Sequence, residues 1–202
     1  MEIENRTIYI RDARIGDAAQ IARFFLMAWP VESFLADNPG MTEDDFARYI
    51  EGFVKAEDTI YSYLNTIVAA CEDENGNEVL CGAMNGYDGG LYEKMKAPII
   101  ESLKSIEPAL SEDFAKVKET EAGEFYFDSV GVSPMMRSRG IGKLLFSGME
   151  EMAKREGHRT VGLIVDVAKP KAEALYRKIG FEFINEIDFL GNKMKHLQKN
   201  LF

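Results

Sequence analysis

The stretch that most constrains this chain runs from Glu124 to Gly142 and reads EFYFDSVGVSPMMRSRGIG. Its first part is rich in aromatic and β-branched residues, which favour a strand over Phe125–Val132. Ser133-Pro134 closes that strand, because proline has no N–H to donate to a neighbouring strand. From residue 140 to residue 156 apolar side chains recur at helical spacing. The stretch therefore predicts a strand, a short loop with glycines and a helix.

The loop has the pattern Arg137-x-x-Gly140-x-Gly142, which predicts an anion-binding site. It places backbone N–H groups at the start of a helix, where the helix dipole favours negative charge. Gly140 and Gly142 have no Cβ, so a ligand can approach the backbone closely. Arg137, Arg139 and Lys143 add positive charge at the same place. We expect the ligand to be a phosphate or a pyrophosphate.

Two common phosphate-binding motifs do not fit this loop. A P-loop needs a Lys-Ser/Thr pair, whereas Lys143 is followed here by Leu144. A dinucleotide-binding loop needs three glycines as G-x-G-x-x-G, which is a different spacing. Arg-x-x-Gly-x-Gly after Val-x-Val-x-Pro instead resembles motif A of the GNAT N-acetyltransferases, which cradles the pyrophosphate of acetyl-CoA. Residues 172–181, AEALYRKIGF, resemble the second block of that family, A-x-x-L-Y-x-x-x-G-F.

The resemblance implies a GNAT-like α/β (α+β) fold, with a mixed, twisted and splayed central sheet of about seven strands and helices on both faces. The sequence pattern agrees, since strands pair as hairpins before residue 120 and alternate with helices after it. We expect one domain over residues 1–202. A charged helical segment at about 88–121 reads as an insertion into this fold, acting either as a functional lid or as a cover for a sheet edge.

The resemblance also implies acetyl-CoA as co-substrate and no metal. On the family picture, the strand before the glycine loop offers its backbone to the pantetheine arm and the loop holds the pyrophosphate. Lys169 stands where the family often has an asparagine that caps the next helix, so that cap must come from elsewhere. The residues that we expect to bind the cofactor are Val130, Gly131, Val132, Arg137, Ser138, Arg139, Gly140, Ile141, Gly142, Lys143, Lys169, Ala172 and Tyr176.

Acetyl transfer to an amine needs a neutral amine and a proton for the departing thiolate. A lysine-like amine has a pKa of ~10.4, so a general base assists it at neutral pH. Asp128 is a carboxylate within an otherwise apolar strand, and it is the first candidate for the base or for an anchor of the substrate ammonium. Glu124 is the second candidate. Tyr176 matches the family tyrosine that often protonates the thiolate of CoA.

The acceptor is expected to be a primary amine of a small molecule or a peptide. Trp29 and Phe34 are candidates to line its pocket, together with Tyr126 and Asp128. Tyr126 occupies roughly the position where some relatives carry a catalytic glutamate, which leaves the choice of base open. Two other functions stay open as well: a non-catalytic acyl-CoA sensor, and transfer to a protein N-terminus or lysine.

Composition restricts the partners. A net charge of −10 argues against non-specific nucleic-acid binding. The chain has no apolar run of membrane-spanning length and no N-terminal apolar signal segment, so we expect a cytoplasmic protein without a membrane partner. Relatives in this family often dimerise, which makes a homodimer a candidate assembly. Asn75-Gly76 predicts a hairpin. A two-residue turn there would place Cys71 and Cys81 on opposite faces, whereas a three-residue turn would place them opposite each other.

Overall fold

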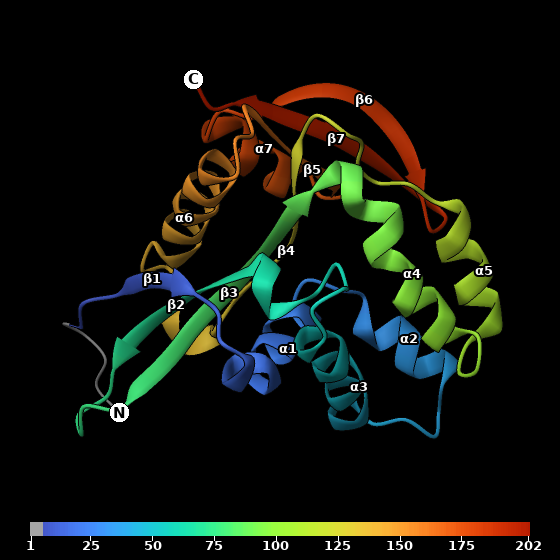
Figure 1. Cartoon of the computed structure of the whole chain (residues 1–202), viewed down its shortest axis with the longest axis horizontal. Helices are drawn as coiled ribbons and strands as arrows, with labels where there is room; N and C mark the ends of the chain where they lie inside the picture. The colour runs from blue at the N-terminus through green and yellow to red at the C-terminus, as the bar shows by residue number, and fades with distance from the viewer. Residues whose placement is uncertain (1–5) are drawn as a thin grey trace. The chain divides into compact units, whose positions relative to one another are not determined.

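The stretch from Glu124 to Gly142 folds as predicted in the computed structural model, which describes residues 6–202 (Figure 1). Seven strands form one sheet: β1 Tyr9–Asp12, β2 Thr66–Glu72, β3 Glu78–Asp88, β4 Phe125–Val132, β5 Thr160–Asp166, β6 Glu182–Phe189 and β7 Asn192–Asn200. Within residues 6–202 there are seven α-helices: α1 Ala18–Leu26, α2 Val31–Asp37, α3 Glu43–Lys55, α4 Tyr92–Leu103, α5 Pro108–Lys116, α6 Ile141–Arg155 and α7 Pro170–Lys178.

The sheet is mixed, as predicted, and its strand order is β1-β2-β3-β4-β5-β7-β6. β1, β2 and β3 are antiparallel neighbours, β4 and β5 are parallel, and β7 lies antiparallel between β5 and β6. The ladder between β4 and β5 contains only two residue pairs, Phe125 with Val161 and Tyr126 with Gly162. β5 in contrast pairs with β7 along its whole length, from Thr160 to Asp166. The short parallel ladder agrees with the splayed sheet that the family resemblance implied.

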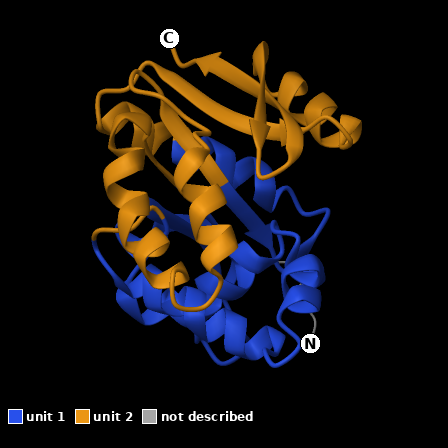
Figure 2. Ribbon diagram, turned by 90° about the vertical axis from the view of Figure 1, so that its right-hand side faces the viewer, with its two compact units in different colours: residues 1–57, 61–85, 129–149 blue, residues 58–60, 86–128, 150–202 orange. Residues whose placement is uncertain are grey.

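The chain divides into two compact units, which Figure 2 colours separately. The first comprises Met1–Glu57, Tyr61–Asn85 and Ser129–Met149, and the second comprises Asp58–Ile60, Gly86–Asp128 and Glu150–Phe202. The chain passes from one unit to the other within β3, β4 and α6. The prediction of a single domain therefore stays a prediction.

The core of the first unit forms where α1 and α3 bury their apolar faces. Ile21 and Phe25 of α1 are fully buried, and Ile50 and Val54 of α3 pack into the same cluster. Thr42 begins α3 with a capping box, because its hydroxyl accepts from the Asp45 N–H at 3.1 Å and Asp45 accepts from the Thr42 N–H at 3.0 Å. Local sequence therefore sets where this helix begins, and its apolar face sets what it packs against.

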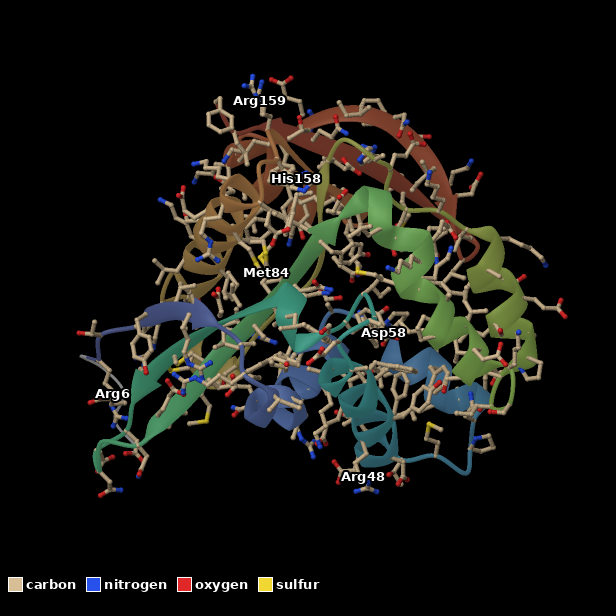
Figure 3. The ribbon with its side chains drawn as sticks, viewed as in Figure 1. Arg6, Arg48, Asp58, Met84, His158 and Arg159 are labelled. Carbon is tan, nitrogen blue, oxygen red and sulfur yellow. The ribbon has the colours of Figure 1, made fainter. Side chains whose placement is uncertain are left out.

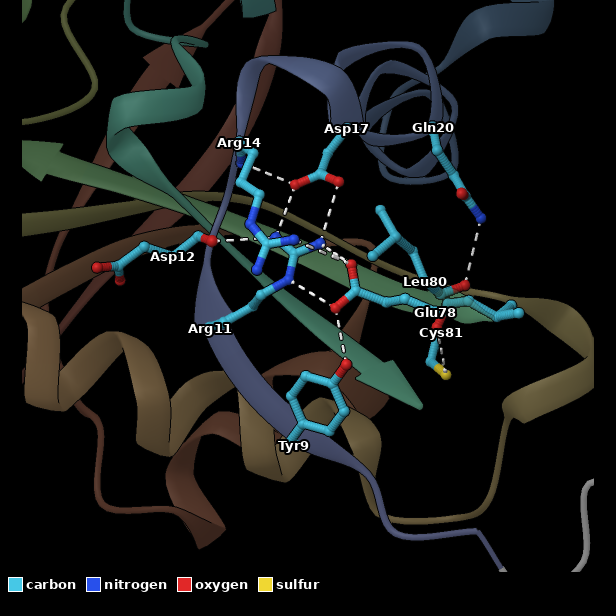
Figure 4. A network of polar contacts seen from close by, with 10 residues as sticks. Tyr9, Arg11, Asp12, Arg14, Asp17, Gln20, Glu78, Leu80 and Cys81 are labelled. Atoms are coloured by element: carbon cyan, nitrogen blue, oxygen red, sulfur yellow. Dashed lines mark hydrogen bonds and ion pairs between the residues drawn. The ribbon is translucent and has the colours of Figure 1, made fainter. Parts of the chain in front are cut away.

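An arginine joins three elements of the first unit (Figure 4). Arg11 of β1 donates to Asp17, which precedes α1, at 2.7 and 3.1 Å, and also binds Glu78 at the start of β3. The Tyr9 hydroxyl donates to the same Glu78 carboxylate at 2.7 Å. The hydrogen bond from Arg11, helped by that from Tyr9, lowers the pKa of Glu78 to about 2. The network links β1 to the start of α1 and to the start of β3.

The loop between β2 and β3 is longer than the turn that Asn75-Gly76 predicted. It spans five residues, 73–77, and is closed by Asp73, which accepts from the Asn75 and Asn77 N–H groups at 2.8 Å each. The register of the two strands shifts at Ala69/Ala70, and the sulfurs of Cys71 and Cys81, which are buried free thiols, lie 3.4 Å apart. The two cysteines therefore share a face. Residues 31–37 form α2.

The segment between β3 and β4 is helical, but it is two helices rather than the single run that the sequence favoured. α4 ends at Leu103, and Pro108 opens α5 at the position where a helix loses nothing by lacking an N–H. The two helices pack on each other, and the Ser111 hydroxyl of α5 donates to the Ile100 carbonyl of α4 at 2.9 Å. α5 ends at Lys116, so residues 117–124 run as an irregular segment into β4.

Candidate active site

The glycine loop belongs to the first unit and begins α6. Ser138 and Gly140 both have left-handed backbone, with φ of 63° and 78°, which bends the chain into the helix. The Leu144 N–H donates to the Gly140 carbonyl at 3.1 Å and makes the first hydrogen bond of the helix. The N–H groups of Ile141, Gly142 and Lys143 come before it, in the first turn, where the helix offers no carbonyl acceptor. These groups are available for an anion at the positive end of the helix dipole.

The protein leaves space beside the two glycines of this loop. A Cβ added to Gly140 or to Gly142 would meet no protein atom within 4 Å. The space next to both glycines is therefore open to a ligand, and no packing within the protein demands a glycine at residue 142. Arg137, Arg139 and Lys143 are exposed around the same turn. The donors and the charge suit a pyrophosphate.

The end of β4 in the first unit offers one face. Along β4 the residues alternate, with Phe127, Ser129 and Gly131 buried and Asp128, Val130 and Val132 only partly buried. A Cβ on Gly131 would lie 2.0 Å from the Phe24 carbonyl oxygen, so α1 packs directly on this strand. β4 therefore turns its buried side to α1 and its accessible side outward.

Ser129 of β4 makes hydrogen bonds to two side chains of the first unit. Its N–H donates to the side-chain oxygen of the buried Asn85 at 3.0 Å, and its hydroxyl accepts from the Trp29 indole at 2.9 Å. Trp29 is half-buried, and its ring lies 4.9 Å from the ring of Tyr61. Phe34 stacks on Phe46 at 4.3 Å. Trp29 and Phe34, two of the four residues predicted to line the acceptor pocket, thus belong to an aromatic cluster of the first unit, and Trp29 also contacts β4.

In the second unit, Asp128 lies in a group of tyrosines. Its carboxylate accepts a hydrogen bond from the buried Tyr87 hydroxyl at 2.9 Å. The neighbouring Tyr126 is 1% exposed, and its ring centroid lies 5.7 Å from that of Tyr87. The Tyr126 hydroxyl donates at 2.8 Å to Glu119, a carboxylate that is itself buried. The structure therefore brings a second acid to the predicted base.

Glu119 had no signal in the sequence. It lies in the charged stretch KVKETEAGE, which reads as a solvated surface, and the segment reaches β4 only through the tertiary fold. Tyr87 and Tyr92 were likewise indistinguishable from core aromatics. The pairing of Glu119 with Tyr126 thus comes from the structure alone.

The other candidate base, Glu124, lies in a closed network. Its carboxylate accepts from Thr120 at 2.7 Å and from the Gln198 amide at 2.7 Å, and it pairs with His196 at 2.9 Å. Burial alone would raise the pKa of Glu124, but these hydrogen bonds, led by that of His196, lower it. Gly162 leaves room for the carboxylate, since a Cβ there would lie 1.9 Å from it.

Tyr176 lies on α7, whose start and end follow the sequence signals. Pro170 is the first helical residue and Gly180, with φ of 102°, follows the end. Lys169 gives no side-chain cap, and the Asp166 carboxylate instead accepts from the Ala168 N–H at 2.8 Å. The Tyr176 ring meets Phe181 edge to face at 6.2 Å, and burial raises the pKa of its hydroxyl.

Three further observations bound the site. Among residues 6–202 no group of three or more His, Cys, Asp or Glu side chains could hold a metal ion. In the same part of the chain, none of the helices is long and apolar enough to cross a membrane. His158, labelled in Figure 3, packs its ring against Phe125 at 5.4 Å.

Comparison with known proteins agrees with the fold and the motifs. Residues 102–181 match the model of the acetyltransferase (GNAT) family. No curated protein matches the chain. Its structure is similar to a solved acetyltransferase with 27% sequence identity and a TM-score of 0.72, over 96% of this chain and 100% of that one.

Two other solved structures share the fold. An N-acetyltransferase from Staphylococcus aureus Mu50 is 23% identical, with a TM-score of 0.75 over 94% of this chain and 99% of that one. A polyamine N-acetyltransferase from Drosophila melanogaster, which forms N-acetylagmatine, is 15% identical, with a TM-score of 0.57 over 96% and 100%. The glycine loop, the sheet and these comparisons agree: residues 102–181 match the acetyltransferase (GNAT) family model, and the chain has the fold of solved N-acetyltransferases.

Proposed function

We propose that this chain transfers the acetyl group of acetyl-CoA directly to a primary amine of a small molecule or peptide. The observation that carries the proposal is the glycine loop, whose open space, free helix-start N–H groups and exposed cations suit a pyrophosphate. Members of this family use acetyl-CoA, and a relative in fold acts on polyamines. The acidic net charge of −10 also favours a cationic acceptor.

Acetyl-CoA, when bound, supplies the activated acetyl thioester. We assign its pyrophosphate to the backbone and cations of residues 137–143, and its pantetheine arm to the backbone of Val130, Gly131 and Val132. Ala172 and Lys169, at the start of α7, are proposed to contact it as well. These assignments follow the family motifs, and the partly exposed edge of β4 supports them.

Asp128 is proposed to bind the substrate ammonium and to accept its proton. The carboxylate is only half-buried, so an amine can reach it, and Tyr87 fixes its orientation. Proton transfer to such a positioned base contributes about 10²–10⁴-fold in rate. Glu124 is proposed to be structural rather than catalytic, because its oxygens are occupied by Thr120, Gln198 and His196.

Tyr176 is proposed to give its proton to the departing thiolate of CoA. Because burial raises the pKa of its hydroxyl, the phenol keeps its proton at neutral pH and can donate it.

Cys71 and Cys81 are free thiols in this structure. A reducing compartment suits such thiols, and we propose that the reaction takes place in the cytoplasm.

The test measures CoA release from acetyl-CoA with a panel of polyamines, small primary amines and lysine or N-terminal peptides. Wild-type protein should release CoA with at least one amine class. Asp128→Asn keeps the shape and removes the charge, so kcat/KM for that amine should fall ~10²-fold or more while acetyl-CoA affinity holds. Asp188→Asn, an exposed carboxylate of β6, is the control and should change neither.

A folded wild-type protein that binds acetyl-CoA but releases CoA with no amine would favour the acyl-CoA sensor. Turnover with peptides alone would favour transfer to a protein N-terminus or lysine. Intact turnover in Asp128→Asn would contradict the assignment of the base.

A further inference from the structure

Glu119, in the second unit, is buried to an extent that is unusual for a carboxylate. Its residue is 8% exposed, and its Oε2 atom accepts a hydrogen bond from the Tyr126 hydroxyl at 2.8 Å. Tyr126 and Asp128 are two residues apart in β4, so their side chains lie on the same side of the strand. Glu119 therefore contacts Tyr126, the neighbour on that side of the proposed base Asp128.

Each of the two carboxylates, Glu119 and Asp128, accepts a hydrogen bond from a buried tyrosine. Tyr126 donates to Glu119, Tyr87 donates to Asp128, and the two tyrosine rings are 5.7 Å apart. Tyr92 of α4 stacks on Tyr87 at 6.2 Å. Two acids and three buried tyrosines thus share one water-poor region, in which charges interact strongly.

The segment that carries Glu119 is held in place by a buried lysine. Lys96 of α4 is 1% exposed, and its ammonium donates to the Val117 carbonyl at 2.7 Å and to Glu93 at 3.3 Å. The same ammonium lies over the Tyr92 ring at 4.5 Å. The helices inserted between β3 and β4 therefore do more than cover the sheet, because they fix a carboxylate next to Tyr126.

Two carboxylates in such a region cannot both ionise cheaply, so the pair holds one proton near neutral pH. Burial, followed by the charge of Asp128, raises the pKa of Glu119 to about 8, and the hydrogen bond from Tyr126 and the charge of Lys96 oppose this shift. Asp128 is the more exposed of the two acids. Burial therefore favours the neutral, protonated form more strongly at Glu119 than at Asp128.

We propose that Glu119 is a positioning residue of the acid–base site: it carries the proton of the pair so that Asp128 stays ionised, and it sets the proton affinity of Asp128. This inference rests on the proposed function. The proton of the substrate ammonium passes to the Asp128 carboxylate, which becomes a carboxylic acid as the amine becomes neutral. When Glu119 itself ionises, a second negative charge makes Asp128 a stronger base.

The test compares wild type with Glu119→Gln, which fixes the neutral form of the side chain. The ratio of their kcat/KM values for one amine, measured from about pH 6 to about pH 9.5, cancels the ionisation of the substrate. We expect a ratio near 1 at low pH and a rise of about tenfold through the region of pH 8 where Glu119 ionises. A ratio that does not change with pH would overturn the inference.

Two further variants separate this effect from a structural one. Glu121→Gln, an exposed carboxylate of the same segment, should give a flat ratio near 1. Tyr126→Phe removes a hydrogen bond that favours ionised Glu119, so its inflection should move to higher pH. If Glu119→Gln does not fold, the Tyr126→Phe profile decides, and an unmoved inflection there would sink the idea.

An infrared titration of the carboxyl band needs no turnover. Wild type should lose one carboxylic acid signal near pH 8, and Glu119→Gln should lack that step. If wild type acetylates its amine and the step is absent, Glu119 has no such role while the proposed function stands. If wild type shows the step and acetylates no amine, the proposed function fails, and the catalytic role of Glu119 fails with it.

Discussion

At the scale of single residues, substitutions of Gly142 should affect ligand binding and the stability of the fold in different ways. A Cβ there would meet no protein atom within 4 Å, and alanine favours a helix over glycine by about 0.5–1 kcal/mol. Gly142→Ala should therefore raise the Tm of the free protein slightly. The larger Gly142→Val should weaken acetyl-CoA binding at least ~tenfold, or ~1.4 kcal/mol, as measured by calorimetry.

Gly52 in α3 provides the matched control, since a Cβ there also meets nothing within 4 Å. Gly52→Ala should raise the Tm in the same way and leave acetyl-CoA affinity unchanged. Unchanged affinity in a folded Gly142→Val variant would place the pyrophosphate elsewhere.

Tyr176 tests the proton donor. Tyr176→Phe removes only the hydroxyl, and the ring that meets Phe181 edge to face remains. Because the hydroxyl is proposed to act on the departing thiolate, kcat should fall by ~10²–10⁴-fold while KM for acetyl-CoA changes little. Steady-state kinetics at saturating amine provide the measurement. Tyr63→Phe, whose hydroxyl bonds to the exposed Glu57, is the control, and wild-type turnover in Tyr176→Phe would return this residue to a packing role.

At the scale of elements, Arg11 of β1 links the start of α1 to the start of β3. Arg11→Gln removes the guanidinium that bridges the carboxylates of Asp17 and Glu78, and leaves Glu78 with Arg14 at 3.6 Å. The network is only partly exposed, so we expect a loss of about 1–3 kcal/mol in the free energy of unfolding at neutral pH. Arg48→Gln removes an exposed pair on α3, labelled in Figure 3, and should cost less than ~0.5 kcal/mol.

The pH dependence of this loss follows from Glu78. Its pKa is depressed to about 2 in the folded protein, from an ordinary value of 4.5. The stabilisation is therefore fully present above about pH 4.5 and is lost as the pH falls toward 2. Denaturant unfolding of wild type and Arg11→Gln should give a difference that is constant from pH 7 to pH 5 and shrinks below that. A difference that grows on acidification would contradict the network.

At the scale of the whole molecule, ligand binding should appear as thermal stabilisation. A ligand that binds only the native state at ~100 times its Kd stabilises by ~2.7 kcal/mol, and each kcal/mol moves the Tm of a chain of this size by ~2–4 °C. We expect acetyl-CoA to raise the Tm by roughly 5–11 °C and free CoA nearly as much. NAD should have almost no effect, and a clear NAD shift with no CoA shift would refute the cofactor assignment.

Local chemistry determined the elements around the glycine loop. β4 spans Phe125–Val132 as its aromatic and β-branched residues predicted, and α7 begins at Pro170. Each of these boundaries depends on residues within a few positions, through proline's missing N–H, glycine's free φ and the alternation of apolar side chains. The two motifs that resemble the family are equally local, which is why the fold class could be predicted from the sequence.

Long-range packing decided the acid–base site. Whether Asp128 or Glu124 can bind an amine depends on which groups already bond to the carboxylate oxygens. Tyr87, which donates to Asp128, is 41 residues away in the sequence, and His196, which pairs with Glu124, is 72 residues away. The hairpin register depended on a side chain too, because Asp73 closed a longer loop than Asn75-Gly76 predicted. Glu119 reads as a solvated charge in the sequence, but it is buried in the fold, where Lys96 of α4 donates to Val117 of its segment and Tyr126 of β4 donates to Glu119 itself. Burial and pairing across such distances set the pKa of a carboxylate, and no short stretch of sequence contains them.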